Sequence, residues 1–575
     1  MIVYGSPARD IPLAEMVAEV TDLSVTDTLD GLRSFLIACG QLEQAIADEN
    51  LTRGMQDAAR ALTDAAAVAF VAAWSAPRTP HESAPLPSAV RHVACETAPY
   101  AEQVVRVVAP EGFAFYTLYP EQYIEAALQW SSSHPRAARV LVLGVRSIGT
   151  TLSAVVAATL SSRSIQARRM TVRPTGHPFN RTAEISGEDI EQSEWALIVD
   201  EGPGASGSSV AACAEALVSR GFNPDRIAFL PGHAGMPGSA ASAETMRWWK
   251  TTARFVVPLP DMRWQGRSLP EVLADSCAAI GVSGQVTDIH DLGGGLWRQH
   301  VYPNPADYPA TATPFERSKY LCRIRTPDGP RSVLWKFAGV GAAEEKRRMA
   351  TLAAAGWSNP PLGESMGFVA REWLDGAPLT RGDADSEVAR AIGRYVWEAR
   401  TEPADLRQRV AALGRISHMA YHNTLEGLGK ESAESILALA GRLDAASNGG
   451  IPGYGDGRLD PHEWIREPGG RLARTDCAGH DRDHTCVGWQ PVWWDLAGAL
   501  VEWGQDGELE RELMDSYAVA GGQLPPPEAL AFYHAAYCAF RMGLSRFCAS
   551  CSDVEEANRH LRDYERYRNY FAARV

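Results

Sequence analysis

The sequence predicts an α/β protein with two folded parts of different construction, preceded by a helical segment. Between about residues 95 and 265, short apolar runs alternate with helix-like runs, which is typical of a parallel sheet. From about residue 285, a strand-rich stretch is followed by a long helix-rich stretch, which indicates a two-lobed α+β arrangement. We therefore expect three regions, 1–92, 93–280 and 281–575.

The composition is that of an ordinary globular protein. The 575 residues are 45% hydrophobic and 22% charged, and the formal net charge is −15. This charge, with no block of Lys and Arg, argues against a nucleic-acid partner. The longest apolar run, 65–74, is too short to cross a bilayer, and no signal-peptide pattern precedes it, so we expect no membrane partner. Ten scattered cysteines favour the reducing cytoplasm.

Residues 10–75 are expected to form helices that carry no chemical motif. Apolar residues recur there at helical spacing: Leu29, Leu32, Leu36, Cys39 and Leu42. Such helices could cap the next region or join copies into a homo-oligomer. The proline-rich residues 76–92 are expected to be a linker.

The first folded part contains the most informative segment of the chain. Its predicted strands are Arg139–Gly144, Ile165–Val172, Ala196–Val199 and Arg226–Leu230. After the third strand come Asp200 and Glu201, a Gly/Ser loop and a helical run over 210–217. Ligands bind at the carboxyl ends of such strands, and a small-residue loop that opens a helix offers N–H groups to phosphate. The segment predicts a phosphorylated-sugar site, with an ordinary turn as the alternative.

These residues resemble the signature of the type I phosphoribosyltransferases. The resemblance implies that Asp200 and Glu201 contact the ribose of 5-phosphoribosyl-1-diphosphate (PRPP), stabilise charge on its ring and serve as Mg²⁺ ligands. It also implies that a loop binds the 5-phosphate, formed by Ala205, Ser206, Gly207, Ser208 and Ser209. The sequence departs from the family in having Glu as the second acid and a spacer, 202–204, that differs by one residue.

Two further segments extend this resemblance. Arg146, Ser147 and Gly149 follow the first strand, where the family binds pyrophosphate; a capped helix start is the alternative. A basic segment matches the family's mobile loop and contributes Arg173 and His177, with Arg181, as catalytic candidates; a solvated loop is the alternative. The acceptor pocket would come from Phe113–Tyr123 and from residues after 231.

The second folded part resembles the aminoglycoside-phosphotransferase branch of the protein-kinase-like fold. Strand Ser332–Phe337 carries Lys336, which matches the lysine that pairs ATP phosphates, and Glu344 or Glu345 would be its partner. Three other matches are the hinge at Trp373, the metal-binding acid Asp476 and the motif Trp494–Ala497 that braces the catalytic loop.

The catalytic loop itself departs from that family. Residues 456–464 resemble it, but Arg458 stands at the position of the catalytic Asp and Glu463 at that of the metal-binding Asn. An arginine cannot accept the proton of a hydroxyl acceptor. Asp456 or Asp460 would have to substitute; Asp460 is a nucleotide-site candidate, and Glu463 with Asp476 would hold Mg²⁺. A pseudokinase that binds nucleotide is the alternative.

A cluster of metal-binding residue types overlaps this region: Cys477, His480, Asp483, His484 and Cys486. Its spacing is not a standard zinc pattern, so a polar loop over the nucleotide site is the favoured interpretation. The pair Cys548 and Cys551 is interpreted as partly buried thiols.

We therefore predict a transferase that moves phosphoribosyl from PRPP to a small nitrogen acceptor, releases pyrophosphate and carries a fused kinase-like unit. The first alternative is an ATP-dependent small-molecule kinase with a regulatory PRPP-binding part. The second is a sensor of PRPP or nucleotide without catalytic activity. Release of pyrophosphate from PRPP, or consumption of ATP, would distinguish them.

Overall fold

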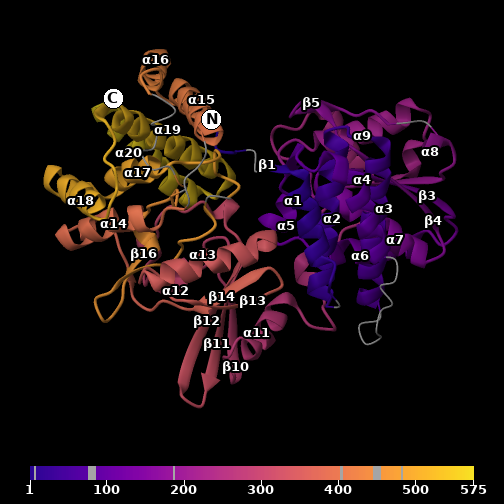
Figure 1. Cartoon of the computed structure of the whole chain (residues 1–575), viewed down its shortest axis with the longest axis horizontal. Helices are drawn as coiled ribbons and strands as arrows, with labels where there is room; N and C mark the ends of the chain where they lie inside the picture. The colour runs from indigo at the N-terminus through magenta and orange to yellow at the C-terminus, as the bar shows by residue number, and fades with distance from the viewer. Residues whose placement is uncertain are drawn as a thin grey trace. The chain divides into compact units, whose positions relative to one another are not determined.

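The chain forms two compact units in the computed structural model (Figure 1). The structure describes residues 1–5, 8–26, 28–75, 86–185, 188–401, 406–443, 453, 455–480, 483–504 and 506–574. One unit is Ala8–Val272, and the other combines Met1–Pro7 with Leu273–Val575. The N-terminal helices, expected as a separate segment, thus belong to the unit that holds the parallel sheet.

The Ala8–Val272 unit is built on a five-stranded parallel sheet in the order β4-β3-β7-β8-β9. Its strands are β3 (Arg139–Val145), β4 (Gln166–Val172), β7 (Trp195–Val199), β8 (Ile227–Leu230) and β9 (Ala253–Arg254). Two antiparallel pairs lie outside it: β1 (Ala8–Pro12) with β2 (Val104–Val108), and β5 (Thr175–His177) with β6 (Asn180–Thr182). The four predicted strands and the parallel sheet are confirmed.

Helices cover both faces of this sheet. They are α1 (Leu13–Leu23), α2 (Leu29–Asp48), α3 (Arg53–Ser75), α4 (Leu86–Thr97), α5 (Glu111–Ala114), α6 (Pro120–Ser133), α7 (Ile148–Ser162), α8 (Glu188–Glu191), α9 (Ser208–Ser219) and α10 (Ala243–Thr251). Leu141 and Ile198 pack with Val210 and Cys213 of α9 on one face. On the other, α7 contacts β3, β4 and β7, and α2 and α3 pack against α7.

The predicted linker is partly wrong. Residues 76–85 lie outside the described part of the chain, but helix α4 begins at Leu86, inside the predicted linker. The helix forms because Val90 and Val93 are buried about one turn apart, and the proline at position 87 lies in the first turn, where a helix tolerates it.

The second unit begins with a five-stranded antiparallel sheet in the order β10-β11-β12-β14-β13. Its strands are β10 (Gln285–Asp291), β11 (Lys319–Thr326), β12 (Gly329–Phe337), β13 (Pro361–Ser365) and β14 (Phe368–Glu372). Helix α13 (Ala342–Ala354) packs on β13 and β14. A second sheet joins β15 (Ala377–Pro378), β16 (Trp464–Arg466) and β17 (Leu472–Arg474).

The rest of this unit is helical, as the sequence predicts. Its remaining helices are α12 (Arg298–Val301), α14 (Ser386–Glu398), α15 (Leu406–Leu428), α16 (Lys430–Ala440), α17 (Val492–Trp503), α18 (Gly507–Val519), α19 (Pro527–Cys551) and α20 (Val554–Arg574), while α11 (Leu269–Ala279) contains the boundary between the units. Val3 is fully buried in this core, and the Asn423 side-chain amide pairs with both backbone groups of Ile2. The first residues of the chain are therefore part of this unit.

Among the described helices, none combines the length and apolar character that crossing a bilayer requires.

Candidate active site

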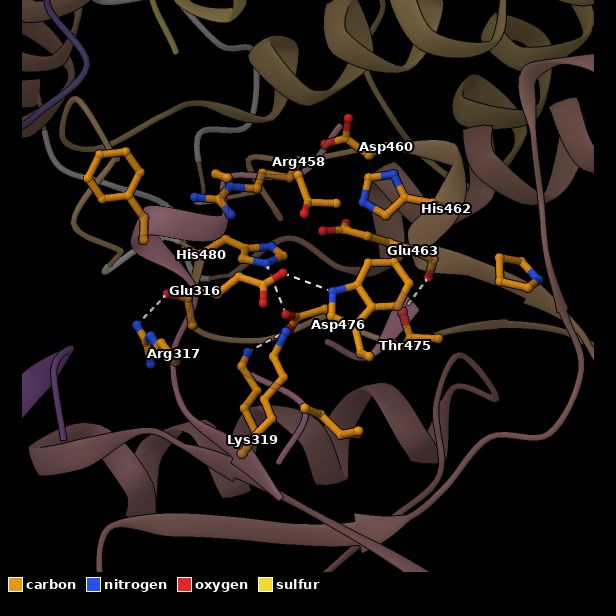
Figure 2. Close-up of a pocket in the computed structure, with 18 of the residues that line it drawn as sticks. Glu316, Arg317, Lys319, Arg458, Asp460, His462, Glu463, Thr475, Asp476 and His480 are labelled. Atoms are coloured by element: carbon orange, nitrogen blue, oxygen red, sulfur yellow. Dashed lines mark hydrogen bonds and ion pairs between the residues drawn. The ribbon is translucent and has the colours of Figure 1, made fainter. Parts of the chain in front are cut away.

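A cavity of about 150 Å³ lies in the Leu273–Val575 unit, lined by side chains from the antiparallel sheet and from the helical part (Figure 2). Its apolar wall includes Leu292, Leu334, Trp373 and Leu374. The predicted hinge residue Trp373 thus lines this cavity. Charged residues line much of the remainder, and an apolar wall combined with a few polar groups is typical of small-molecule sites.

Lys336 is the centre of the charged part. Its ammonium lies 2.5 Å from Asp476 Oδ1 and 3.4 Å from Glu345 Oε1. Burial by itself lowers the Lys336 pKa, but the charges of Asp476 and Glu345 outweigh burial and raise it. The same lysine holds the pKa of the buried Asp476 well below its usual range. The sequence predicted these three residues together, and Glu345 rather than the exposed Glu344 is the partner.

Two cations that sequence reasoning missed lie beside this triad. Arg317 donates to Glu345 at 3.2 Å and to the Gly479 carbonyl at 3.1 Å. Lys319 stands opposite Lys336 in the β11–β12 register and lines the same cavity. The only signal for Lys319 is the strand register, since residues opposite each other in adjacent strands share a face.

The predicted catalytic loop is braced as the resemblance implies. The Asp495 carboxylate, on α17, accepts the backbone N–H groups of Asp456 and, at 2.9 Å, of Gly457. Burial, followed by the charge of Asp456, raises the Asp495 pKa to about 7. Both N–H bonds need the carboxylate oxygens as acceptors, so Asp495 fixes the loop through its backbone.

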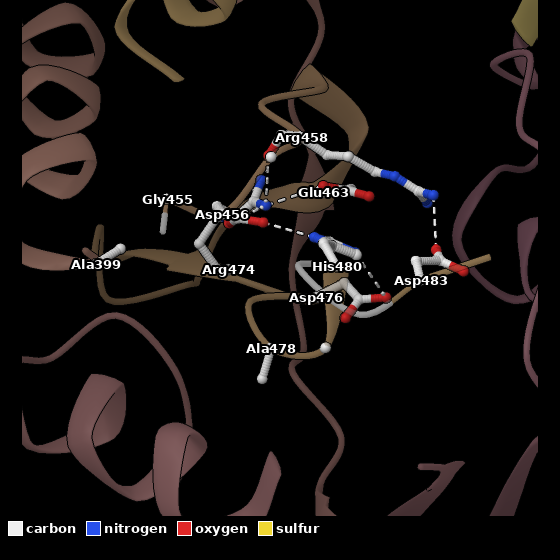
Figure 3. Close-up of polar contacts among 12 residues, drawn as sticks. Ala399, Gly455, Asp456, Arg458, Glu463, Arg474, Asp476, Ala478, His480 and Asp483 are labelled. Atoms are coloured by element: carbon white, nitrogen blue, oxygen red, sulfur yellow. Dashed lines mark hydrogen bonds and ion pairs between the residues drawn. The ribbon is translucent and has the colours of Figure 1, made fainter. Parts of the chain in front are cut away.

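The Asp456 carboxylate contacts Arg474 and His480, as Figure 3 shows. It accepts hydrogen bonds from Tyr395, from Arg474 at 2.6 Å and from His480 at 2.5 Å. Burial alone raises the Asp456 pKa, but the charges of Arg474 and His480 outweigh it and hold this pKa at about 2. The His480 pKa rises to about 10 despite burial, because Asp476 and Asp456 flank the ring. Asp456 is a structural anion here.

The remaining loop residues form charge pairs. Arg458 donates to Asp483 and to Thr485, both at 2.6 Å. Asp460 binds Arg541 through two hydrogen bonds of 2.6 and 2.7 Å. Asp456 and Asp460, the two predicted substitutes for the missing catalytic Asp, are thus each held by an arginine.

The carboxylates that line the cavity suit Mg²⁺. Asp476 and Glu463 both line it, and Mg²⁺ prefers one or two carboxylates together with substrate phosphates. Among the described residues, no group of three or more His, Cys, Asp or Glu side chains could hold a metal ion by itself. In place of a zinc site, His480 and Asp483 pair with Asp456 and Arg458, and Cys486 donates to the Gly488 carbonyl.

In the Ala8–Val272 unit, Asp200 and Glu201 lie at the carboxyl end of β7, as predicted. Glu201 accepts the Gly112 N–H at 2.6 Å, and the Tyr123 hydroxyl donates to the Asp200 carbonyl at 2.7 Å. The segment predicted to form the acceptor pocket therefore contacts the acid pair. Burial raises the pKa of Asp200 to about 7 and that of Glu201 well above its usual value.

The predicted pyrophosphate loop, which contains Arg146, and the predicted mobile loop, which contains Arg173, both contact one acidic residue that the sequence analysis did not identify. Asp48, at the end of α2, binds Arg146 at 3.0 Å and also binds Arg173. Ser147 and Gly149 lie at the start of α7. The exposed His177 accepts the Phe179 N–H at 3.2 Å, and its ring contacts the Phe179 ring edge-on. The structure therefore joins the two arginines but not His177.

The predicted 5-phosphate loop already has partners within the chain. The hydroxyls of Ser206 and Ser208 donate to the Pro178 carbonyl at 3.1 and 2.8 Å, and the Gly207 N–H donates to the Pro203 carbonyl. The Ala205 carbonyl accepts the Ala240 N–H, while Ser209 lies in the first turn of α9. Phosphate binding there would require the Pro178 turn to move. PRPP binding stays a prediction.

The raised Asp200 pKa predicts that this unit loses stability as the pH rises from acid toward neutral values. The folded protein keeps this proton up to about pH 7, whereas an unfolded aspartate releases it near about pH 4. Stability therefore falls as pH rises between these values. We expect Asp200→Asn to stabilise the unit by about 1–3 kcal/mol at pH 8 and hardly at all near pH 4. Hydrogen exchange of the β7 amides measures this.

Exposed Asp225 in the same unit provides the control. Asp225→Asn should change the exchange of β7 equally little at both pH values. An Asp200→Asn variant that is no more stable than the wild type at pH 8 would contradict the assigned protonation.

Comparison with family models and with curated proteins finds no match. Among solved structures, the chain is similar to a choline/ethanolamine kinase family protein from Mesorhizobium loti, with 16% identity over 52% of this chain and 96% of that one, at a TM-score of 0.33. It is similar to spectinomycin phosphotransferase APH(9)-Ia, with 8% identity over 52% of this chain and 93% of that one, at a TM-score of 0.34. It is also similar to an ethanolamine kinase from Plasmodium vivax, with 10% identity over 64% of this chain and 96% of that one, at a TM-score of 0.34. At such TM-scores, the evidence for function is the geometry of the site itself.

Proposed function

We propose that the Leu273–Val575 unit binds ATP in its cavity and that the protein is an ATP-dependent phosphotransferase acting on a small molecule. The observation that carries this proposal is the triad of Lys336, Glu345 and Asp476 at a cavity with an apolar wall. An ammonium held between two carboxylates is a fixed positive charge that can bind phosphate oxygens, and the apolar wall suits the adenine ring of ATP.

Mg²⁺ fits this proposal through Asp476 and Glu463. When bound, it would neutralise charge on the triphosphate. The protein's own contribution is to fix Lys336 through Glu345 and to hold Glu463 through Arg474, which donates to it at 2.9 Å. Phosphoryl transfer depends mainly on such positioning and on charge stabilisation.

The proposal is tested by titrating the full chain with ATP in the presence and absence of Mg²⁺, using calorimetry. We expect saturable binding at one site that Mg²⁺ strengthens. Asp476→Asn should lower the affinity for ATP in the presence of Mg²⁺ at least tenfold, because it removes the negative charge of a proposed Mg²⁺ ligand. Asp328→Asn, on the exposed β11–β12 turn, should leave the titration unchanged. A wild-type chain that does not bind ATP would refute the proposal.

A further inference from the structure

We propose that the phosphoryl acceptor of this site is an anionic oxygen group, a carboxylate or a phosphate, and that Arg458 binds it. This inference rests on the proposed function and names its substrate class. A hydroxyl acceptor loses a proton during transfer and needs a base near it. An anionic oxygen does not.

The carboxylates of the loop and the neighbouring Asp483 are unsuited to act as that base, because each is held by a cation; Glu463 accepts a hydrogen bond from Arg474 at 2.9 Å. Asp456 accepts three side-chain hydrogen bonds, and Asp460 is held by two bonds from Arg541. Asp483 lies 2.6 Å from Arg458. Each is paired with a cation, which stabilises the ionised form and weakens it as a proton acceptor.

Arg458 occupies the position of the catalytic Asp in the loop and lines the cavity. One-fifth of its side chain is exposed, and its guanidinium donates hydrogen bonds to Asp483 and Thr485. The guanidinium fork matches carboxylate and phosphate geometry with two parallel hydrogen bonds. An anionic acceptor can therefore share or replace Asp483 as its partner. Figure 3 shows Arg458 extended toward Asp483, away from Asp456.

Nearby cations add to this preference. Lys319, Lys336 and Arg317 line the same cavity, so a second anion beside the triphosphate meets positive charge as well as the carboxylates that pair with Lys336 and Arg317. Without these cations, the repulsion between two anions would oppose transfer.

The transfer balances without a base. A lone pair of the acceptor oxygen forms a bond to the γ-phosphorus of ATP. The bond from that phosphorus to the β,γ-bridging oxygen breaks, and ADP leaves with its electron pair. No proton leaves the acceptor. The product is an acyl phosphate from a carboxylate or a phosphoric anhydride from a phosphate.

His462 offers the rival mechanism. Its imidazole lines the cavity and stacks on Trp297, with ring centroids 5.8 Å apart. An imidazole is a suitable base near neutral pH, so a hydroxyl acceptor would depend on His462. The two mechanisms therefore predict different sensitive residues.

The test measures ADP release by the full chain from Mg-ATP with paired probes: ribose 5-phosphate against ribose, glycerol 3-phosphate against glycerol, and acetate against acetamide. We expect release with anionic members only. Arg458→Ala should lower that release at least tenfold, with Mg-ATP affinity within twofold of wild type, and added guanidinium should restore part of it. The exposed Arg471→Ala is the control. Phosphorus NMR or hydroxylamine trapping identifies the anhydride or acyl phosphate.

Failure of the two proposals can be told apart. Absence of ATP binding refutes the proposed function. ATP binding with release from ribose, glycerol or acetamide, or with no release from any anionic probe, overturns the anionic acceptor and leaves nucleotide binding in place. A greater loss in His462→Gln than in Arg458→Ala, or no rescue by guanidinium, also overturns it.

Discussion

Replacing Arg474 by methionine is expected to destabilise the Leu273–Val575 unit by about 3–5 kcal/mol, the cost of breaking a buried ion pair. Arg474, on β17, has no exposed side-chain surface and donates to Asp456, Glu463 and the Arg458 carbonyl. Its guanidinium also lies 5.2 Å from the Trp464 ring centroid. Methionine keeps much of the volume but leaves the carboxylates of Asp456 and Glu463 without this cation.

Equilibrium denaturation of the full chain, followed by hydrogen exchange of the β17 and α17 amides, measures this loss. Arg471→Met is the matched control, because Arg471 is exposed and pairs with Glu467 at the surface, where such pairs contribute less than about 1 kcal/mol. The double variant Arg474→Met/Asp456→Asn should recover part of the stability, since it removes the unpaired charge. If Arg474→Met were no worse than the control, the network would not hold the loop.

The ion pair of Arg474 and Asp456 also sets the pH below which this unit loses stability. The folded Asp456 has a pKa of about 2, below the value of about 4 for an unfolded aspartate. Its contribution is therefore complete above about pH 4 and is lost as the pH falls toward 2. In Arg474→Met this pKa should rise, so that acid unfolding begins at a higher pH than in the wild type.

Local patterns predicted the elements that bury one or two faces. The runs of β3 and β7 are buried on both faces, and such continuous apolar segments stand out in a sequence. Lys336, Glu345 and Asp476 were predicted from the resemblance to the kinase-like family, which assigns each a place in a strand, in a helix or after a strand. Their contacts follow once those elements pack.

Contacts between distant segments have no such signal. Asp48 joins Arg146 and Arg173 from a helix about a hundred residues earlier in the chain, and Val3 enters a core formed mainly by residues after 350. Arg541 reaches Asp460 from α19. A single arginine or valine carries no information about which distant partner it meets; only the fold decides that.

The order of the functional hypotheses changes for a physical reason. A Gly/Ser loop offers N–H and hydroxyl groups, but the same groups can satisfy each other within the chain, as Ser206, Ser208 and Pro178 do. Lys336 lines a cavity and its neighbours are acids that hold it there. The structure therefore supports the kinase-like site more strongly than the PRPP site.

Replacing Lys336 by methionine is expected to weaken Mg-ATP binding by about ten- to a hundredfold. A hydrogen bond from a charged donor contributes about 1.5–3 kcal/mol, and each 1.4 kcal/mol is about tenfold in affinity. The loss has a second source. Without the ammonium, Glu345 and Asp476 leave negative charge facing the triphosphate, since Lys336 is the cation within 3.4 Å of both.

Calorimetric titration of the full-length variant with Mg-ATP measures the effect, and hydrogen exchange of β12 verifies that the strand is still folded. Lys336→Arg keeps the charge and should lose less affinity. Lys346→Met, on the exposed face of α13 with a 3.6 Å pair to Glu364, is the control and should bind like the wild type. Adding Glu345→Gln to Lys336→Met should restore part of the affinity by removing one of the repelling carboxylates. Wild-type affinity in Lys336→Met would show that the nucleotide phosphates do not reach this lysine.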